Sequence, residues 1–147
     1  MSPRQKNPSA DHKDEAGRRL AFARGDLDSA TALLGTGTPN RNLGYLAQQA
    51  VEKALKAVIL LDNAPFEMTH DLTAVAAQLP AEFLTPVDVA DLAWLADLET
   101  SARYPDEGDM ITGDDGRRAA GMADTILAAV AAHFTARGVD EAQIGPE

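Results

Sequence analysis

Residues 48–57 of this 147-residue chain are QQAVEKALKA, and they lie inside a run from about Arg41 to Leu61 in which alanine and leucine dominate. Both are among the strongest helix formers. Apolar residues recur along the run at spacings of three and four, which places them on one side of a helix. They are Leu43, Leu46, Ala47, Ala50, Ala54, Ala57, Val58 and Leu61. The run therefore predicts an amphipathic helix with a buried apolar stripe.

The opposite side of this predicted helix is polar and carries Gln49, Glu52, Lys53 and Lys56. Glu52 and Lys56 are four residues apart, the spacing at which opposite charges pair along a helix. This polar side is either only solvated or also part of a binding site, and the other motifs of the chain are needed to choose.

Composition limits both the fold and the chemistry. Apolar residues make up 45% of the chain but aromatic residues only 5%, so alanine, leucine and valine must build the core, which suits packed helices better than sheets. The chain contains no cysteine, which excludes disulfides, thiol catalysis and cysteine zinc sites. Its histidines, His12, His70 and His133, have no partner at a standard ligand spacing, so we expect no metal and no cofactor.

Helical periodicity recurs along most of the chain. Besides the helix at 41–61, we expect helices at about residues 11–34, 69–79, 86–101 and 114–137. The predicted fold is all-α, an up-and-down bundle of about five helices. The stripe of the first helix is expected to include Leu34, while Thr69 caps the third helix and Gly138 ends the last. We expect a disordered leader at 1–11, a helical domain at 12–137 and a flexible tail at 138–147.

The formal net charge is −10, which argues against non-specific binding of nucleic acid by the whole surface. The charge is uneven, because no lysine or arginine lies between Ala57 and Ala102, where acidic residues are frequent. No apolar run approaches the roughly 20 residues that span a bilayer. The polar N-terminus lacks the apolar segment of a secretory signal. We expect a soluble cytoplasmic protein with no membrane partner.

Three short stretches carry polar or bulky residues that a plain bundle would not need. They are the pattern Gln-Gln-x-x-Glu-Lys-x-x-Lys at 48–56, Thr69-His70-Asp71-Leu72, and Ala102-Arg103-Tyr104-Pro105-Asp106. With these stretches in this order, the chain resembles the HEPN domains, small helical proteins named for higher eukaryotes and prokaryotes nucleotide-binding. The resemblance is to the bacterial and archaeal single-domain branch and covers about residues 12–136.

The resemblance implies a compact helical bundle that forms a homodimer. Members of this branch are often encoded beside a minimal nucleotidyltransferase, with which they form a two-component, toxin–antitoxin-like complex. Many HEPN proteins are metal-independent ribonucleases, with an arginine followed after four to six residues by a histidine on the last helices. In that chemistry the histidine moves protons near neutral pH and the arginine stabilises the charge that develops on the phosphate.

This ribonuclease signature is missing from the chain. No histidine follows Arg103, Arg117 or Arg118 at the required spacing, and His133 precedes Arg137 by four residues, which is the reverse order. We therefore expect His133 to be a structural or surface residue, and the ribonuclease activity of the family is not carried over to this chain.

A weaker group of residues could bind an anion. Its members are Lys53, Lys56, His70, Arg103 and Tyr104. A helix N-terminus together with lysine and arginine side chains is a suitable phosphate site. The alternative is structural, with solvated lysines, a His70 that caps or packs, and an Arg103 paired with a neighbouring aspartate.

Together these observations predict a nucleotide- or anion-binding or partner-binding module, with a nucleotidyltransferase as its partner and a nucleotide or RNA as a candidate ligand. Two alternatives stay open. One is a metal-independent ribonuclease that uses His70, Arg103 and Lys53 in another arrangement, and the other is a non-catalytic helical scaffold.

Overall fold

The computed structural model describes residues 8–36, 40–62, 71–79, 89–102 and 112–139. These residues form five helices: α1 (Pro8–Leu33), α2 (Asn40–Leu61), α3 (Leu72–Ala76), α4 (Val89–Ala102) and α5 (Gly113–Ala136). The described part of the chain contains no strand. The predicted all-α fold of about five helices is therefore confirmed. The first helix begins at Pro8, so it overlaps the segment predicted as a disordered leader.

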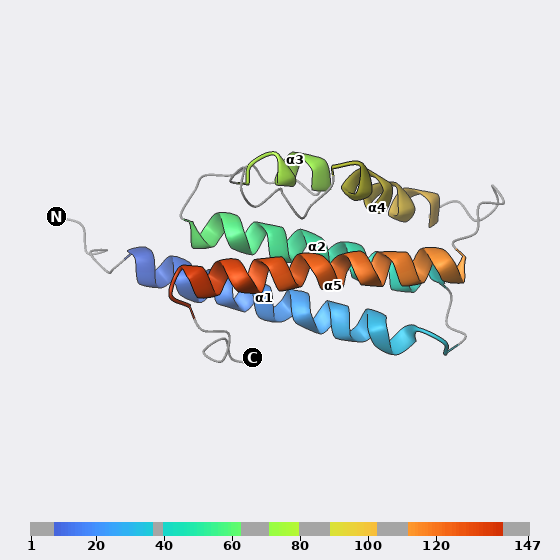
Figure 1. The fold of residues 1–147 in the computed structure, drawn as a ribbon, viewed down its shortest axis with the longest axis horizontal. Helices are drawn as coiled ribbons and strands as arrows, with labels where there is room; N and C mark the ends of the chain where they lie inside the picture. The colour runs from blue at the N-terminus through green and yellow to red at the C-terminus, as the bar shows by residue number, and fades with distance from the viewer. Residues whose placement is uncertain (1–7, 37–39, 63–70, 80–88, 103–111, 140–147) are drawn as a thin grey trace.

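The helix α2 is the central element of the bundle. The long helices α1 and α5 pack along it, and the shorter α3 and α4 lie on a further side of it (Figure 1). The helices α1, α2, α4 and α5 alternate in direction along the chain (Figure 1). Because α2 has neighbours on several sides, more of its surface is buried than a single amphipathic stripe would require.

The core draws large side chains from every helix. Fully buried examples are Leu20 of α1, Leu55 of α2, Leu72 of α3, Leu95 of α4 and Phe134 of α5. Helical spacing places six apolar residues on one side of α5, and all of them are buried: Ala119, Ala123, Ile126, Leu127, Val130 and Phe134. Small alanines between these larger residues allow the helices to approach closely, as the composition indicates.

Two predictions about helix ends are wrong. Leu34 does not belong to the buried stripe: α1 ends at Leu33, and the Leu34 side chain is 37% exposed. The third helix is capped by Asp71 rather than by Thr69. The Asp71 carboxylate accepts a hydrogen bond of 3.0 Å from the backbone N–H of Thr73, whereas Thr69 lies outside the described residues. An aspartate side chain here satisfies a backbone donor that the helix itself leaves without a partner.

Both ends of α5 are closed by local hydrogen bonds. At the start, Thr112 and Asp115 form a capping box, in which each side chain accepts a hydrogen bond from the other residue's backbone N–H. At the end, Gly138 has a φ of 84°, and the backbone N–H of Val139 donates to the carbonyl of Phe134 over 2.9 Å. This is the glycine-terminated helix end that the sequence predicts. Val139 is itself buried, so the residue after the glycine packs onto the bundle.

Among the described helices, α5 is the one that is long and apolar enough to cross a membrane by length and composition. It also packs against α2 and α1, with its apolar side in the core. The core helix of a soluble bundle passes the same test, so this finding is weak evidence for a membrane span.

Candidate functional site

The predicted anion-binding residues divide into two groups. Lys53 and Lys56 lie on α2 within the described part of the chain, whereas His70, Arg103 and Tyr104 fall outside it. The convergence of all five residues therefore stays a prediction. What the structure does describe is the surroundings of the two lysines.

Lys53 joins α2 to α1. Its Nζ donates a hydrogen bond to Oδ2 of Asp26 over 2.6 Å, and the two side chains are 36% and 21% exposed. The same Nζ lies 5.9 Å from the centre of the Phe22 ring, also on α1. The Lys53 ammonium thus interacts with a carboxylate and with the face of an aromatic ring.

Lys56 lies inside the bundle, not in solvent. It is 6% exposed, and its Nζ donates to Oε2 of Glu52 over 2.9 Å, with Glu52 itself 5% exposed. The pairing of Glu52 with Lys56 is confirmed, and because both residues are buried, this part of the polar side is not solvated. The cause is tertiary: helical spacing shows which residues share a side of α2, but not that another part of the fold covers that side.

A third buried polar residue continues this row toward the start of α2. Gln48 precedes Glu52 by four residues and is 3% exposed, and its buried Oε1 has no hydrogen-bond partner among the described residues. Gln48, Glu52 and Lys56 therefore form one buried polar row along the helix. Such a row stabilises the bundle little, because removing two opposite charges from water offsets much of their attraction.

The charges around the two lysines limit the chemistry they can perform. Each ammonium group is hydrogen-bonded to a carboxylate of the same chain. A phosphate that approached either lysine would have to displace Asp26 or Glu52, or bind beside a negative charge. Displacing Glu52 would leave a buried carboxylate without this partner, which is strongly unfavourable.

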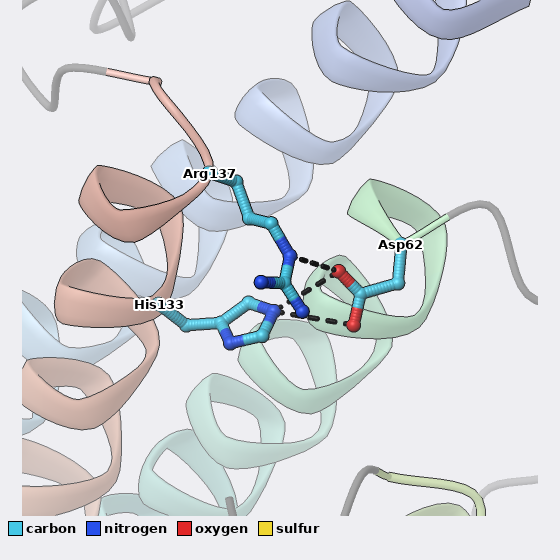
Figure 2. Close-up of polar contacts among 3 residues, drawn as sticks. All are labelled: Asp62, His133 and Arg137. Atoms are coloured by element: carbon cyan, nitrogen blue, oxygen red, sulfur yellow. Dashed lines mark hydrogen bonds and ion pairs between the residues drawn. The ribbon is translucent and has the colours of Figure 1, made fainter.

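A second cluster, which no sequence motif indicates, joins the C-terminal ends of α2 and α5. The Asp62 carboxylate accepts hydrogen bonds from Nε2 of His133 over 3.0 and 3.2 Å and from Nε of Arg137 over 3.0 Å (Figure 2). The side chains of His133 and Asp62 are 9% and 16% exposed. The only local signal is the spacing of four between His133 and Arg137, which puts both on one side of α5. Their partner is 71 residues away from His133.

The environment of Asp62 changes its acidity. Burial by itself would raise the pKa of this carboxyl group, but the hydrogen bonds from Arg137 and His133 and their charges outweigh burial and lower the pKa below 3.8. Asp62 is therefore ionised at neutral pH and holds two basic side chains of α5. The cluster combines a carboxylate, an imidazole and a guanidinium, which are groups found in acid–base chemistry on phosphates.

A third contact links α4 to α5. The Arg118 guanidinium lies 3.9 Å from the centre of the Trp94 ring and donates to Asp91 over 3.0 Å. This contact is partly exposed and ties α5 to α4, which packs mainly on α2 and α3. Within the described ranges, no three histidine, aspartate or glutamate side chains gather closely enough to hold a metal ion.

Comparison with known proteins places the chain in a family. A family model described as HEPN domain matches residues 16–133, which is most of the chain. The match covers α2, α3 and α4 completely, and most of α1 and α5. Neither the curated proteins nor the solved structures gave a match.

Proposed function

The chain belongs to the HEPN domain family, and from this premise we propose that it is a non-catalytic binding module in the cytoplasm. In this proposal it forms the protein-binding half of a two-component, toxin–antitoxin-like complex with a nucleotidyltransferase. The neutralisation of the two lysines on α2 is the observation that supports protein binding over anion binding.

Both lysines of the family-like stretch at 48–56 have carboxylate partners within the chain. Lys53 bonds to Asp26 of α1, and Lys56 is buried against Glu52. These residues therefore join and fill the bundle, and neither presents an unneutralised positive charge to a ligand. Together with the missing Arg-to-His spacing, this pattern favours a domain that works through its outer surfaces.

The proposal predicts that a neighbouring gene encodes a minimal nucleotidyltransferase, and it is tested with that protein and the full chain. We expect the two purified proteins to form a stable complex, measured by light scattering after size-exclusion chromatography and by titration calorimetry. We expect the Lys53→Ala variant to bind this partner as tightly as a matched control, Lys13→Ala, which removes an exposed lysine of α1. The absence of any complex would contradict the proposal.

A titration with ATP separates the anion-binding alternative. We expect no saturable binding that depends on Lys53 or Lys56. The contrary result is that ATP binds and that its affinity falls at least about tenfold in Lys53→Ala, with thermal stability unchanged. Lys53 would then contribute about 1.4 kcal/mol or more to ATP binding. The lysine site would then be real and our assignment wrong. Arg103→Ala tests in the same way the part of the predicted site that lies outside the described residues.

One observation favours a second candidate function, a metal-independent ribonuclease. The cluster of Asp62, His133 and Arg137 places a histidine beside a carboxylate and a guanidinium, a group of side chains that could transfer a proton and bind a phosphate. The Arg137 Nε already bonds to Asp62, and this favours a structural role. Cleavage of single-stranded RNA by the purified chain, lost in His133→Gln but kept in Lys13→Ala, would establish the ribonuclease instead.

A further inference from the structure

Different neighbours bury different sides of α2. Lys53 bonds to α1 and Asp62 bonds to α5, and the nine positions between these two residues put them on opposite sides of the helix. The helices α1 and α5 also pack on each other. They therefore enclose one of the two flanks of α2 between Lys53 and Asp62, the flank on which Ala54 is fully buried. The opposite flank carries the buried polar row of Gln48, Glu52 and Lys56.

The described helices that pack on this opposite flank are α3 and α4. Both contact α2 and each other, and Figure 1 shows them on the side of α2 away from α1. Their inner sides are apolar, since Leu72 and Val75 of α3 and Leu92 and Leu95 of α4 are fully buried. We call α3 and α4 together the cover.

Arg118 connects the cover to α5. Its guanidinium donates a hydrogen bond to Asp91 over 3.0 Å and lies 3.9 Å from the centre of the Trp94 ring. Asp91 and Trp94 are three residues apart, so they share one side of α4. The Arg118 and Asp91 side chains are 48% and 44% exposed, and water therefore competes with their ion pair. We call these three residues the Arg118 clamp.

The surface beneath the cover is unfavourable to keep away from water. The buried Oε1 of Gln48 has no hydrogen-bond partner among the described residues, and the ion pair of Glu52 with Lys56 is also buried. Removal from water weakens each of these groups, and water would solvate them again if the cover moved away. The flank enclosed by α1 and α5 carries the apolar Ala54 instead. Separating the cover from α2 is therefore easier than separating α1 or α5.

We propose that α3 and α4 open and close as one cover over the polar row, and that the Arg118 clamp is its latch. In the closed form the polar row is inaccessible to any ligand. In the open form α2 presents an amide, a carboxylate and an ammonium group beside the apolar Leu55 and Ile59, which are buried when the cover is closed. The cover thus controls access to one flank of α2. This proposal does not depend on the nucleotidyltransferase complex, and failure to form that complex would leave it standing.

Thiol labelling tests the opening, because the natural chain has no cysteine. Gln48→Cys places a thiol beneath the cover, and its matched control, Val58→Cys, places one at a fully buried position on the flank enclosed by α1 and α5. With Ellman's reagent under native conditions, we expect the thiol at position 48 to react at least about tenfold faster, because it needs only local opening. Its rate should also rise less steeply with urea, because local opening exposes less surface than global unfolding does.

A second pair of variants tests the latch in the Gln48→Cys background. Arg118→Gln should raise the labelling rate about tenfold, since it removes both an exposed ion pair and a cation–π contact. The matched control is Arg117→Gln, because the neighbouring Arg117 is also exposed but pairs with Asp114 of its own helix. This control should change the rate by less than about twofold. Circular dichroism checks that each variant is folded.

Two results would overturn the proposal. Equal labelling rates at positions 48 and 58, with the same dependence on urea, would show that α3 and α4 do not open separately from the bundle. Equal effects of Arg118→Gln and Arg117→Gln would show that the Arg118 clamp is not the latch. If Gln48→Cys does not fold, Ile59→Cys replaces it, because Ile59 is buried on the same flank of α2.

Discussion

Asp62 accepts hydrogen bonds from two side chains of α5, and thereby joins the C-terminal ends of α2 and α5. By contrast, Glu52 and Lys56 both belong to α2, so their buried ion pair does not connect two helices. Asp62 forms contacts between helices that are distant in sequence, so its removal should weaken the attachment of one helix to another. The shift of its pKa makes this contribution measurable as a function of pH.

We expect Asp62→Asn to destabilise the protein by about 2 kcal/mol at neutral pH, since hydrogen bonds to charged groups contribute about that much. The pKa of Asp62 is lower in the folded state than its ordinary value. The stabilisation that ionised Asp62 gives the folded state is therefore fully present above the pKa of an aspartate in the unfolded chain, about 4. It is lost as the pH falls through the lower pKa of the folded state. Urea unfolding at a series of pH values should show the difference between wild type and variant shrinking in acid.

The control for this experiment is Asp124→Asn, which changes an exposed aspartate on α5. It should alter the unfolding free energy by less than about 0.5 kcal/mol, as surface substitutions usually do. A difference between Asp62→Asn and wild type that does not depend on pH would show that the carboxylate charge does not hold the two helices together.

At the scale of the element, one glycine within α5 and one just after its end have opposite requirements. Gly138 ends the helix with a φ of 84°, a conformation that is strained for any residue with a side chain. Gly121 lies within α5 at an exposed position, and a Cβ added there would meet no atom within 4 Å. The sequence predicts the role of Gly138, because a glycine just after an amphipathic run is a typical helix end.

These two glycines make a matched pair of substitutions. Gly138→Ala should lower the free energy of unfolding by about 1 kcal/mol, because alanine is disfavoured in the left-handed conformation. Gly121→Ala should raise it by up to about 1 kcal/mol, because alanine is the better helix former. Thermal unfolding followed by circular dichroism measures both. If the two variants shifted the midpoint in the same direction, the assigned ends of α5 would be incorrect.

At the scale of the whole molecule, the packing is uneven. The helices α1, α2 and α5 pack against one another, whereas α3 and α4 pack mainly on α2 and on each other. The three long helices bury apolar residues on several turns each, while α3 is only five residues long. A helix of that length has no stability of its own and depends on its neighbours.

Amide hydrogen exchange should reveal this difference. We expect the backbone amides of α3 and α4 to exchange through local opening, with smaller protection factors than the central amides of α2 and α5, which should open only on global unfolding. Measurement by mass spectrometry or NMR under native conditions distinguishes these cases. Equal protection in all five helices would mean that the bundle opens as one cooperative unit.

The sequence by itself determined the helical class, most of the helix bounds, the inward side of α5, the glycine at its end and the family. All of these follow from spacing and helix-end residues, which act over a few positions. Sequence reasoning failed where the answer lay in another helix. Lys53 meets Asp26 across 27 residues, and His133 meets Asp62 across 71.

Only the tertiary structure decided the state of the polar side of α2. The sequence correctly placed Glu52 and Lys56 within pairing distance, but it could not show that both are buried or that Lys53 is bonded to another helix. The physical reason is that helical periodicity assigns residues to a side of a helix, whereas solvation depends on what packs against that side. A row of charged residues that looks solvated in the sequence is, in the folded chain, an internal contact of the bundle.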